Sequence, residues 1–237
     1  MLQTMKYTHL FFDMDNTLAP FRQLILPEMT ELLNKFTADI VIVSGQSNDK
    51  IEWQSNAHPA IRMGQNGNEA ADVDGTKLWY TPLTEAERNE VYTHIALLKK
   101  HFDVSENPEW NPVEDRGAQI TYSPIGNTAP VEVKATFDPD RSKRLAALAH
   151  TPLVSDTLTV KIGGSTSFDY FPATRNKGTN VQRLIDLKGW NSDECVYFGD
   201  GLFPGGNDEA VIGVTDTVAV TDQNDTYERL QKLLSER

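Results

Sequence analysis

An apolar run near the N-terminus that ends in two carboxylates constrains the fold most. Residues 8–12 read as a short buried strand, and Asp13 and Asp15 follow it two residues apart. A helix-like segment with proline in its first turn (27–36) and a second apolar run (Asp39–Val43) come next. Strand, helix and strand in this order predict a parallel sheet with a right-handed crossover. We therefore expect an α/β protein with a doubly wound sheet, whose ligand-binding edge carries both carboxylates.

The strand–helix pattern stops near Pro82 and resumes at Lys177. Between them lie a helix that starts at a capping box, a loop rich in Pro, Asn and Glu at 105–115, and several short strands. This texture predicts an α+β insertion within the sheet domain. The expected domains are a catalytic core of residues 1–81 and 175–237 and a cap of residues 82–174, which would determine substrate specificity.

The chemistry of the paired carboxylates suits phosphoryl transfer. Asp13 can attack phosphorus and form an aspartyl-phosphate. Asp15 can act as a general acid toward the leaving oxygen and as a general base toward the acceptor. Two carboxylates facing a phosphate would repel it, so a Mg²⁺ ion is expected to offset their charge. The alternative is an acidic turn after a strand, without catalytic function.

Three later features favour the catalytic interpretation. Ser44 and Gly45 follow the second strand and can bind a phosphate oxygen. Lys177 opens a helix and can neutralise phosphoryl charge, and Asp200 and Asp208 follow a third apolar strand, where they could bind magnesium. Each feature alone has an ordinary structural explanation, but their joint order is hard to obtain by chance.

This order resembles the four motifs of the haloacid dehalogenase superfamily, and the resemblance covers the whole chain. It implies that Asp13 is the nucleophile and Asp15 the acid/base. It also implies a metal bound by Asp13, the backbone carbonyl of Asp15, and Asp200, with Asp208 as a further candidate. Thr17, which completes the first motif, is a phosphate-binding candidate.

Within that superfamily the chain resembles the eukaryotic-type phosphomannomutases. The segments that carry this resemblance are Ser-Pro-Ile-Gly at 123–126, the run at 162–172, and Pro-Gly-Gly-Asn-Asp at 204–208. It implies a reversible shift of phosphate between O6 and O1 of mannose, with hexose 1,6-bisphosphate as an intermediate and activator, and a homodimer formed through the caps. The residues that it assigns to substrate are Arg22, Arg116, Ser167 and Asp169.

The chain departs from that family at three positions. Asn127 and Lys134 stand where the family carries arginines that bind the distal phosphate, and Asn16 replaces a glycine. Both cap positions stay phosphate-binding candidates, but neither offers the bidentate fork of arginine. A sugar-phosphate phosphatase is therefore the first alternative, and a non-catalytic phosphosugar-binding protein is the second. Ser167 and Asp169 could also be the polar face of a half-buried strand.

Composition limits the partners and the compartment. The net charge of -12 and the pI near 4.8 argue against nucleic acid or an anionic membrane as a partner. No apolar stretch approaches the length of a membrane span or a signal peptide. Cys195 is the only cysteine, which excludes a disulfide within the chain and favours a reducing, cytoplasmic compartment. The expected partner is a small phosphorylated sugar.

Overall fold

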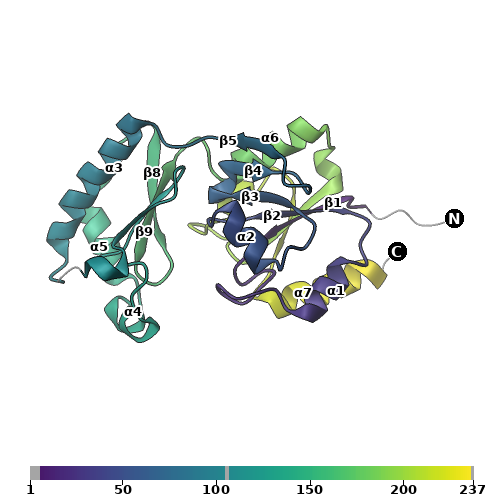
Figure 1. The fold of residues 1–237 in the computed structure, drawn as a ribbon, viewed down its shortest axis with the longest axis horizontal. Helices are drawn as coiled ribbons and strands as arrows, with labels where there is room; N and C mark the ends of the chain where they lie inside the picture. The colour runs from purple at the N-terminus through teal and green to yellow at the C-terminus, as the bar shows by residue number, and fades with distance from the viewer. Residues whose placement is uncertain (1–5, 105–106, 236–237) are drawn as a thin grey trace. The chain divides into compact units, whose positions relative to one another are not determined.

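The computed structural model describes residues 6–104 and 107–235 (Figure 1). The first two residues of the loop predicted at 105–115 therefore lie outside the described residues. The chain forms two compact units. One, here called the core unit, consists of the segments up to Tyr80 and from Arg175, and the other, the inserted unit, spans Thr81–Thr174.

The core unit is built on a seven-stranded sheet with the strand order β11-β10-β1-β2-β3-β4-β5. Neighbouring strands from β11 to β3 run parallel, whereas β4 and β5 add an antiparallel hairpin. The strands are β1 (His9–Asp13), β2 (Asp39–Val43), β3 (Ile61–Gly64), β4 (Glu69–Ala71), β5 (Lys77–Tyr80), β10 (Cys195–Gly199) and β11 (Asp216–Ala219).

Helices cover both faces of this sheet. They are α1 (Pro27–Leu33), α2 (Asn48–Gln54), α6 (Lys177–Lys188) and α7 (Gln223–Ser235). Because successive strand residues point to opposite faces, Leu10 and Phe12 pack in one apolar cluster with α1 and α7, while Phe11 packs in a second cluster with α6. A parallel sheet buried on both faces needs such continuous apolar strands. The predicted doubly wound α/β fold is confirmed.

The inserted unit is an α+β structure with a four-stranded antiparallel sheet in the order β6-β7-β9-β8. Its strands are β6 (Val113–Asp115), β7 (Ile120–Tyr122), β8 (Leu158–Gly163) and β9 (Ser167–Pro172), and its helices are α3 (Glu85–Leu98), α4 (Val131–Phe137) and α5 (Ser142–His150). Ile120, Phe168 and Tyr170 pack against α3 and α5 on one face of the sheet (Figure 1). The opposite face carries the alternate residues of the same strands, among them Thr121 and Asp169.

Several local predictions are confirmed and others fail. The capping box at the start of α3 is present, with Thr84 accepting from the backbone N–H of Glu87 and the Glu87 carboxylate accepting from the N–H of Thr84. The sequence did not predict α2, β3 or α4, and part of the predicted 105–115 loop is the strand β6. Short 3-10 turns lie at Gln65–Gly67, Lys99–His101, Pro108–Trp110, Ser192–Glu194 and Glu209–Val211. Within residues 6–104 and 107–235, every helix is too short or too polar to cross a lipid bilayer.

Candidate active site

The carboxyl ends of three neighbouring parallel strands bring the predicted core residues together. Asp13 is the last residue of β1, which lies between β2 and β10. In the strand register Asp13 lies opposite Val43 of β2, and Phe12 lies opposite Phe198 of β10. Since Ser44 and Asp200 directly follow those two strands, they flank Asp13 at this edge of the sheet. This is the edge at which open α/β sheets bind ligands.

Lys177 completes the centre of the site from the start of α6. Its Nζ lies 2.5 Å from Oδ1 of Asp13 and 2.7 Å from Oδ1 of Asp208, and all three side chains are buried. The next residue allows this approach: a Cβ on Gly178 would lie 1.8 Å from the carbonyl oxygen of Ala210. Glycine therefore lets α6 pack directly on the turn that follows Asp208, which carries Lys177 to both carboxylates.

Three donors fix the carboxylate of Asp208. Besides Lys177, the hydroxyl of Tyr197 donates to Oδ1 at 2.7 Å, and the N–H of Gly201 donates to Oδ2 at 3.1 Å. Sequence reasoning missed Tyr197, although a tyrosine in an otherwise apolar buried strand needs a polar partner for its hydroxyl. Oδ1 accepts two of these bonds and Oδ2 one, so Asp208 holds Lys177 and keeps a lone pair of Oδ2 for a cation.

Asp13, Asp200 and Asp208 form an acidic cluster that fits a cation. One carboxylate oxygen from each lies within 4.8 Å of the others. Burial raises the pKa of Asp13 to about 8 against the opposing effect of Lys177, and the two neighbouring carboxylates add to the rise. Burial and Asp208 also raise the pKa of Asp200. When Asp13 is ionised, three carboxylates face one ammonium and leave an excess of negative charge. Oxygen donors of this kind are the ligands that hard divalent cations prefer.

Asp15 is oriented by a separate pair of donors. Its Oδ1 accepts from the side-chain amide of Gln54 at 2.6 Å and from the backbone N–H of Arg22 at 2.8 Å. Gln54 is buried at the end of α2, so sequence reasoning, which did not recognise that helix, had no signal for it. The guanidinium of Arg22 is exposed and lies 5.3 Å from the ring centroid of Phe21. The carboxylate of Asp15 is thus held in one orientation by these two bonds, as its predicted acid/base role requires, and its backbone carbonyl stays a metal-ligand prediction.

The phosphate-binding candidates beside the cluster have defined partners. The hydroxyl of Ser44 is buried and accepts from the N–H of Gln46 at 3.1 Å, while the N–H of Ser44 itself donates to the carbonyl of Met63 in the sheet. Its hydroxyl proton is the group it can offer to a phosphate. Gly45 is half-buried beside it. Thr17 is fully buried, and its hydroxyl accepts from the N–H of Asp200 at 3.1 Å. Thr17 therefore holds the Asp200 loop in place.

Ser167 and Asp169 lie on the face of the inserted sheet opposite α3 and α5. Asp169 accepts a hydrogen bond of 2.8 Å from the hydroxyl of Thr121 on the adjacent strand. The hydroxyl of Ser167 donates to the carbonyl of Gly163 at 2.9 Å. A Cβ on Gly163 would lie 1.8 Å from Oδ2 of Asp169, so the absence of a side chain there makes room for the carboxylate. Both predicted hydroxyl binders are half-buried polar groups on one strand.

The other predicted cap residues already have partners within the inserted unit. Arg116 forms an ion pair of 2.8 Å with Glu114. The side-chain amide of Asn127 donates to the carbonyls of Asn111, Pro112 and Thr121 at 3.0 to 3.3 Å. Lys134 donates to the carbonyl of Asn127 at 2.5 Å. These bonds hold the loop after β7 together and do not favour the expected contact of Asn127 with phosphate.

Comparison with known proteins agrees with this architecture. Among curated proteins, the phosphomannomutase of Schizosaccharomyces pombe is 26% identical over 251 residues, covering 96% of this chain and 95% of the relative. A probable phosphomannomutase of Caenorhabditis elegans is 27% identical over 252 residues, covering 97% and 96%. A haloacid dehalogenase-like hydrolase from Bacteroides thetaiotaomicron has the same fold, with a TM-score of 0.68 at 14% identity over 96% of this chain and 100% of that one.

A family comparison settles the relationship. The model named "Eukaryotic phosphomannomutase" matches residues 101–236, which is more than half of the chain and includes Lys177, Asp200 and Asp208. The curated relatives extend the similarity through the N-terminal segment that carries Asp13 and Asp15. The chain belongs to the eukaryotic phosphomannomutase family.

Proposed function

We propose that the protein is a Mg²⁺-dependent phosphotransferase that interconverts mannose 6-phosphate and mannose 1-phosphate through an aspartyl-phosphate on Asp13. The observation that carries this proposal is the buried contact of Lys177 with Asp13 and Asp208 at the edge of the parallel sheet. The phosphomannomutase relatives support the sugar substrate. The same contacts would suit any phosphate ester. The assignment of the substrate therefore rests on the relatives, and the assignment of the reaction rests on the site.

Each residue of the core site then has a defined task. In the phosphorylated enzyme, Asp15 removes the proton from the free sugar hydroxyl. The oxygen of that hydroxyl attacks phosphorus, and the bond from phosphorus to Asp13 breaks. In the second half-reaction, Asp13 attacks the other phosphate of the bisphosphate, and the bond from that phosphorus to the sugar oxygen breaks. Asp15 returns the proton to the departing sugar oxygen. Lys177 holds Asp13 and offsets part of the phosphoryl charge. Mg²⁺, held by Asp13 and Asp200, would supply the remaining positive charge.

The inserted unit supplies the proposed sugar contacts. Ser167 and Asp169, on the sheet face that α3 and α5 leave uncovered, would bind sugar hydroxyls. Arg116, with a guanidinium capable of two parallel hydrogen bonds, would bind the distal phosphate. In this proposal the core unit carries out phosphoryl transfer, and the inserted unit recognises the sugar and its distal phosphate.

A phosphatase is the second candidate, because of the contacts of Asn127 and Lys134. The amide of Asn127 is used by three backbone carbonyls, and the ammonium of Lys134 contacts the Asn127 carbonyl. A weaker grip on the distal phosphate would let the bisphosphate escape, and water would then accept the phosphoryl group. Hydrolysis needs only the core unit and one phosphate. The contacts of Asn127 and Lys134 with backbone carbonyls therefore favour hydrolysis over the mutase reaction.

Phosphorus NMR of the purified protein with Mg²⁺ and mannose 1-phosphate separates the candidates. We expect mannose 6-phosphate to appear, and to appear faster with a catalytic amount of hexose 1,6-bisphosphate. Inorganic phosphate alone would identify a phosphatase. No turnover of this or other phosphate esters would refute both and leave a binding protein. A parallel sample with excess chelator checks the metal requirement.

A further inference from the structure

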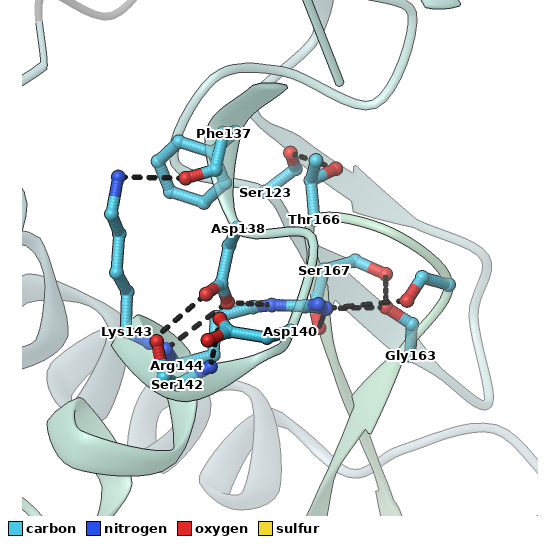
Figure 2. A network of polar contacts seen from close by, with 11 residues as sticks. Ser123, Phe137, Asp138, Asp140, Ser142, Lys143, Arg144, Gly163, Thr166 and Ser167 are labelled. Carbon is cyan, nitrogen blue, oxygen red and sulfur yellow. Dashed lines mark hydrogen bonds and ion pairs between the residues drawn. The ribbon is translucent and has the colours of Figure 1, made fainter. Parts of the chain in front are cut away.

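A buried ion pair in the inserted unit lies behind the turn that carries the proposed hydroxyl binders. Arg144, in the first turn of α5, and Asp138, just after α4, are both fully buried, and Nε of Arg144 lies 2.7 Å from Oδ2 of Asp138. Figure 2 shows the guanidinium of Arg144 reaching from α5, past Asp138, to the β8–β9 turn. Neither residue was a functional candidate from the sequence.

Asp138 fixes the guanidinium at one end. Its carboxylate also accepts from the backbone N–H groups of Lys143 at 2.9 Å and Arg144 at 3.2 Å, so it caps the start of α5 as well. Burial on its own would raise the pKa of Asp138, but the bonds from Arg144 and these N–H groups outweigh it and lower the pKa. The carboxylate is therefore charged, and it sets the direction in which Arg144 points.

The other end of the guanidinium holds the turn. Nη1 of Arg144 donates to the carbonyls of Gly163 at 2.9 Å, Ser167 at 3.2 Å and Gly164 at 3.4 Å. The carbonyl of Gly163 is the same acceptor that the hydroxyl of Ser167 uses (Figure 2). A second bond, from the hydroxyl of Ser123 to that of Thr166 at 3.0 Å, ties the turn to the end of β7. Arg144 thus fixes both the backbone and the hydroxyl orientation at Ser167.

Stability alone explains this pair poorly. A buried ion pair adds little to the free energy of unfolding compared with apolar residues of similar volume, because both charges must leave water. Nη2 of Arg144 is buried and finds no acceptor among residues 6–104 and 107–235, which adds to the cost. A fixed geometry, by contrast, requires the planar and directional donors of arginine. The cost of burial is explained if the position of the turn matters for function.

We propose that Arg144, oriented by Asp138, is a positioning residue that presents Ser167 and Asp169 to the sugar. The proposal rests on the proposed function of those two residues. Gly163 links them: its carbonyl accepts from Arg144 and from Ser167, and its missing side chain makes room for the Asp169 carboxylate. Without Arg144 the turn would populate other conformations. The apparent affinity for the sugar would then fall in proportion to the fraction of molecules whose turn has the binding conformation.

Arg144→Lys tests the proposal, since lysine keeps the charge but cannot reach Asp138 and the turn carbonyls with a planar fork. We expect KM for mannose 1-phosphate to rise about tenfold, the effect of losing a charge-assisted bond. Turnover of p-nitrophenyl phosphate, which has no sugar hydroxyls, should be unchanged. Arg141→Lys is the matched control, because Arg141 is exposed at the start of the same helix. An equal loss on both substrates, or no change on either, would overturn the proposal.

Hydrogen–deuterium exchange provides a readout that does not depend on the substrate. The backbone amides of residues 163–167 should exchange faster in Arg144→Lys than in the parent protein or in Arg141→Lys. If the lysine variant fails to fold, Asp138→Asn, which keeps an acceptor oxygen for the helix cap, replaces it. If the parent protein does not act on mannose 1-phosphate, the proposed function fails, and unchanged exchange in the turn would independently refute the role of Arg144.

Discussion

The hydroxyl of Tyr197 donates to Oδ1 of Asp208, the oxygen that also accepts from Lys177. Tyr197 lies in β10, inside the apolar cluster between the sheet and α6. Its hydrogen bond connects the interior of the core unit to the charged centre of the site. Asp208 thus positions Lys177, which contacts Asp13, and the buried hydroxyl of Tyr197 in turn positions Asp208.

Tyr197→Phe should weaken both stability and catalysis. Removing one bond to a buried carboxylate costs about 1–3 kcal/mol of unfolding free energy, because Asp208 keeps its other donors. Urea denaturation measures this change, and initial rates should fall several-fold through the less fixed Lys177. Tyr92→Phe, at an exposed position of α3, is the control. Full activity in Tyr197→Phe would show that Lys177 and Gly201 alone fix Asp208.

Asp13→Asn should abolish phosphoryl transfer without unfolding the protein. Asparagine lacks the nucleophilic carboxylate, so no aspartyl-phosphate can form. The change also removes one of three crowded carboxylates, so we expect a thermal midpoint no lower than that of the parent protein. Activity above a few per cent of the parent rate would rule out Asp13 as the nucleophile. Incubation with labelled sugar phosphate, followed by acid precipitation, checks whether label stays on the chain.

Metal affinity should depend on pH through Asp13. The folded metal-free protein holds this proton more tightly than the unfolded chain, because the pKa is raised from 3.8 to about 8. The stability contributed by this group is therefore complete below the unfolded pKa and is lost as pH rises through about 8. Mg²⁺ competes with the same proton, so its affinity should increase up to about pH 8 and then level off.

Thermal unfolding with Mg²⁺ and with chelator, at pH values of about 6, 7 and 8.5, tests this dependence. The midpoint with chelator should fall with pH, and the increase caused by Mg²⁺ should grow. An increase of the same size at every pH would mean that Asp13 is ionised throughout. Sodium chloride at the same ionic strength as the Mg²⁺ sample controls for nonspecific screening.

Asn127→Ala separates a structural role from a phosphate-binding role. If the amide of Asn127 mainly holds the carbonyls of Asn111, Pro112 and Thr121, its loss should lower the unfolding free energy by about 1–3 kcal/mol. KM for the sugar phosphate should then change little. A large rise in KM with unchanged stability would instead support the contact with phosphate. Asn127→Arg should restore family-like phosphate binding only if the loop tolerates the loss of these bonds.

The sequence predicted the central strands, and the position of Asp13 and Asp200 at their ends, because these signals are local. Asp13 and Asp200 each end a continuous apolar run, and parallel strands of this kind place their carboxyl ends at one edge of the sheet. Tyr197 and Gln54 were missed for the opposite reason: their hydrogen bonds join segments that no periodicity connects. The helix that carries Gln54 has only two apolar residues in seven, too few for a helical pattern.

The inserted unit was harder to predict because its polar groups depend on tertiary partners. A buried arginine such as Arg144 looks like a surface residue in the sequence, since its acceptors are backbone carbonyls of a distant turn. Asn127 and Lys134 were placed by resemblance, which does not show that their donors meet carbonyl groups of the same loop. The resemblance correctly predicted the family but could not predict how each side chain would be used.

The position of β1 between β2 and β10 also has a consequence for synthesis on the ribosome. His9 pairs with Cys195, near the other end of the chain, whereas the inserted unit is one continuous segment of sequence. The inserted unit can therefore fold as soon as it emerges. The strand that ends in Asp13 can pair early with β2, but its other edge stays unpaired until β10 has been made. Until β10 and the loop after it have been translated, Asp13 stays apart from Asp200 and Asp208. The buried contact of Lys177 with Asp13 and Asp208 therefore cannot be completed in a shorter nascent chain.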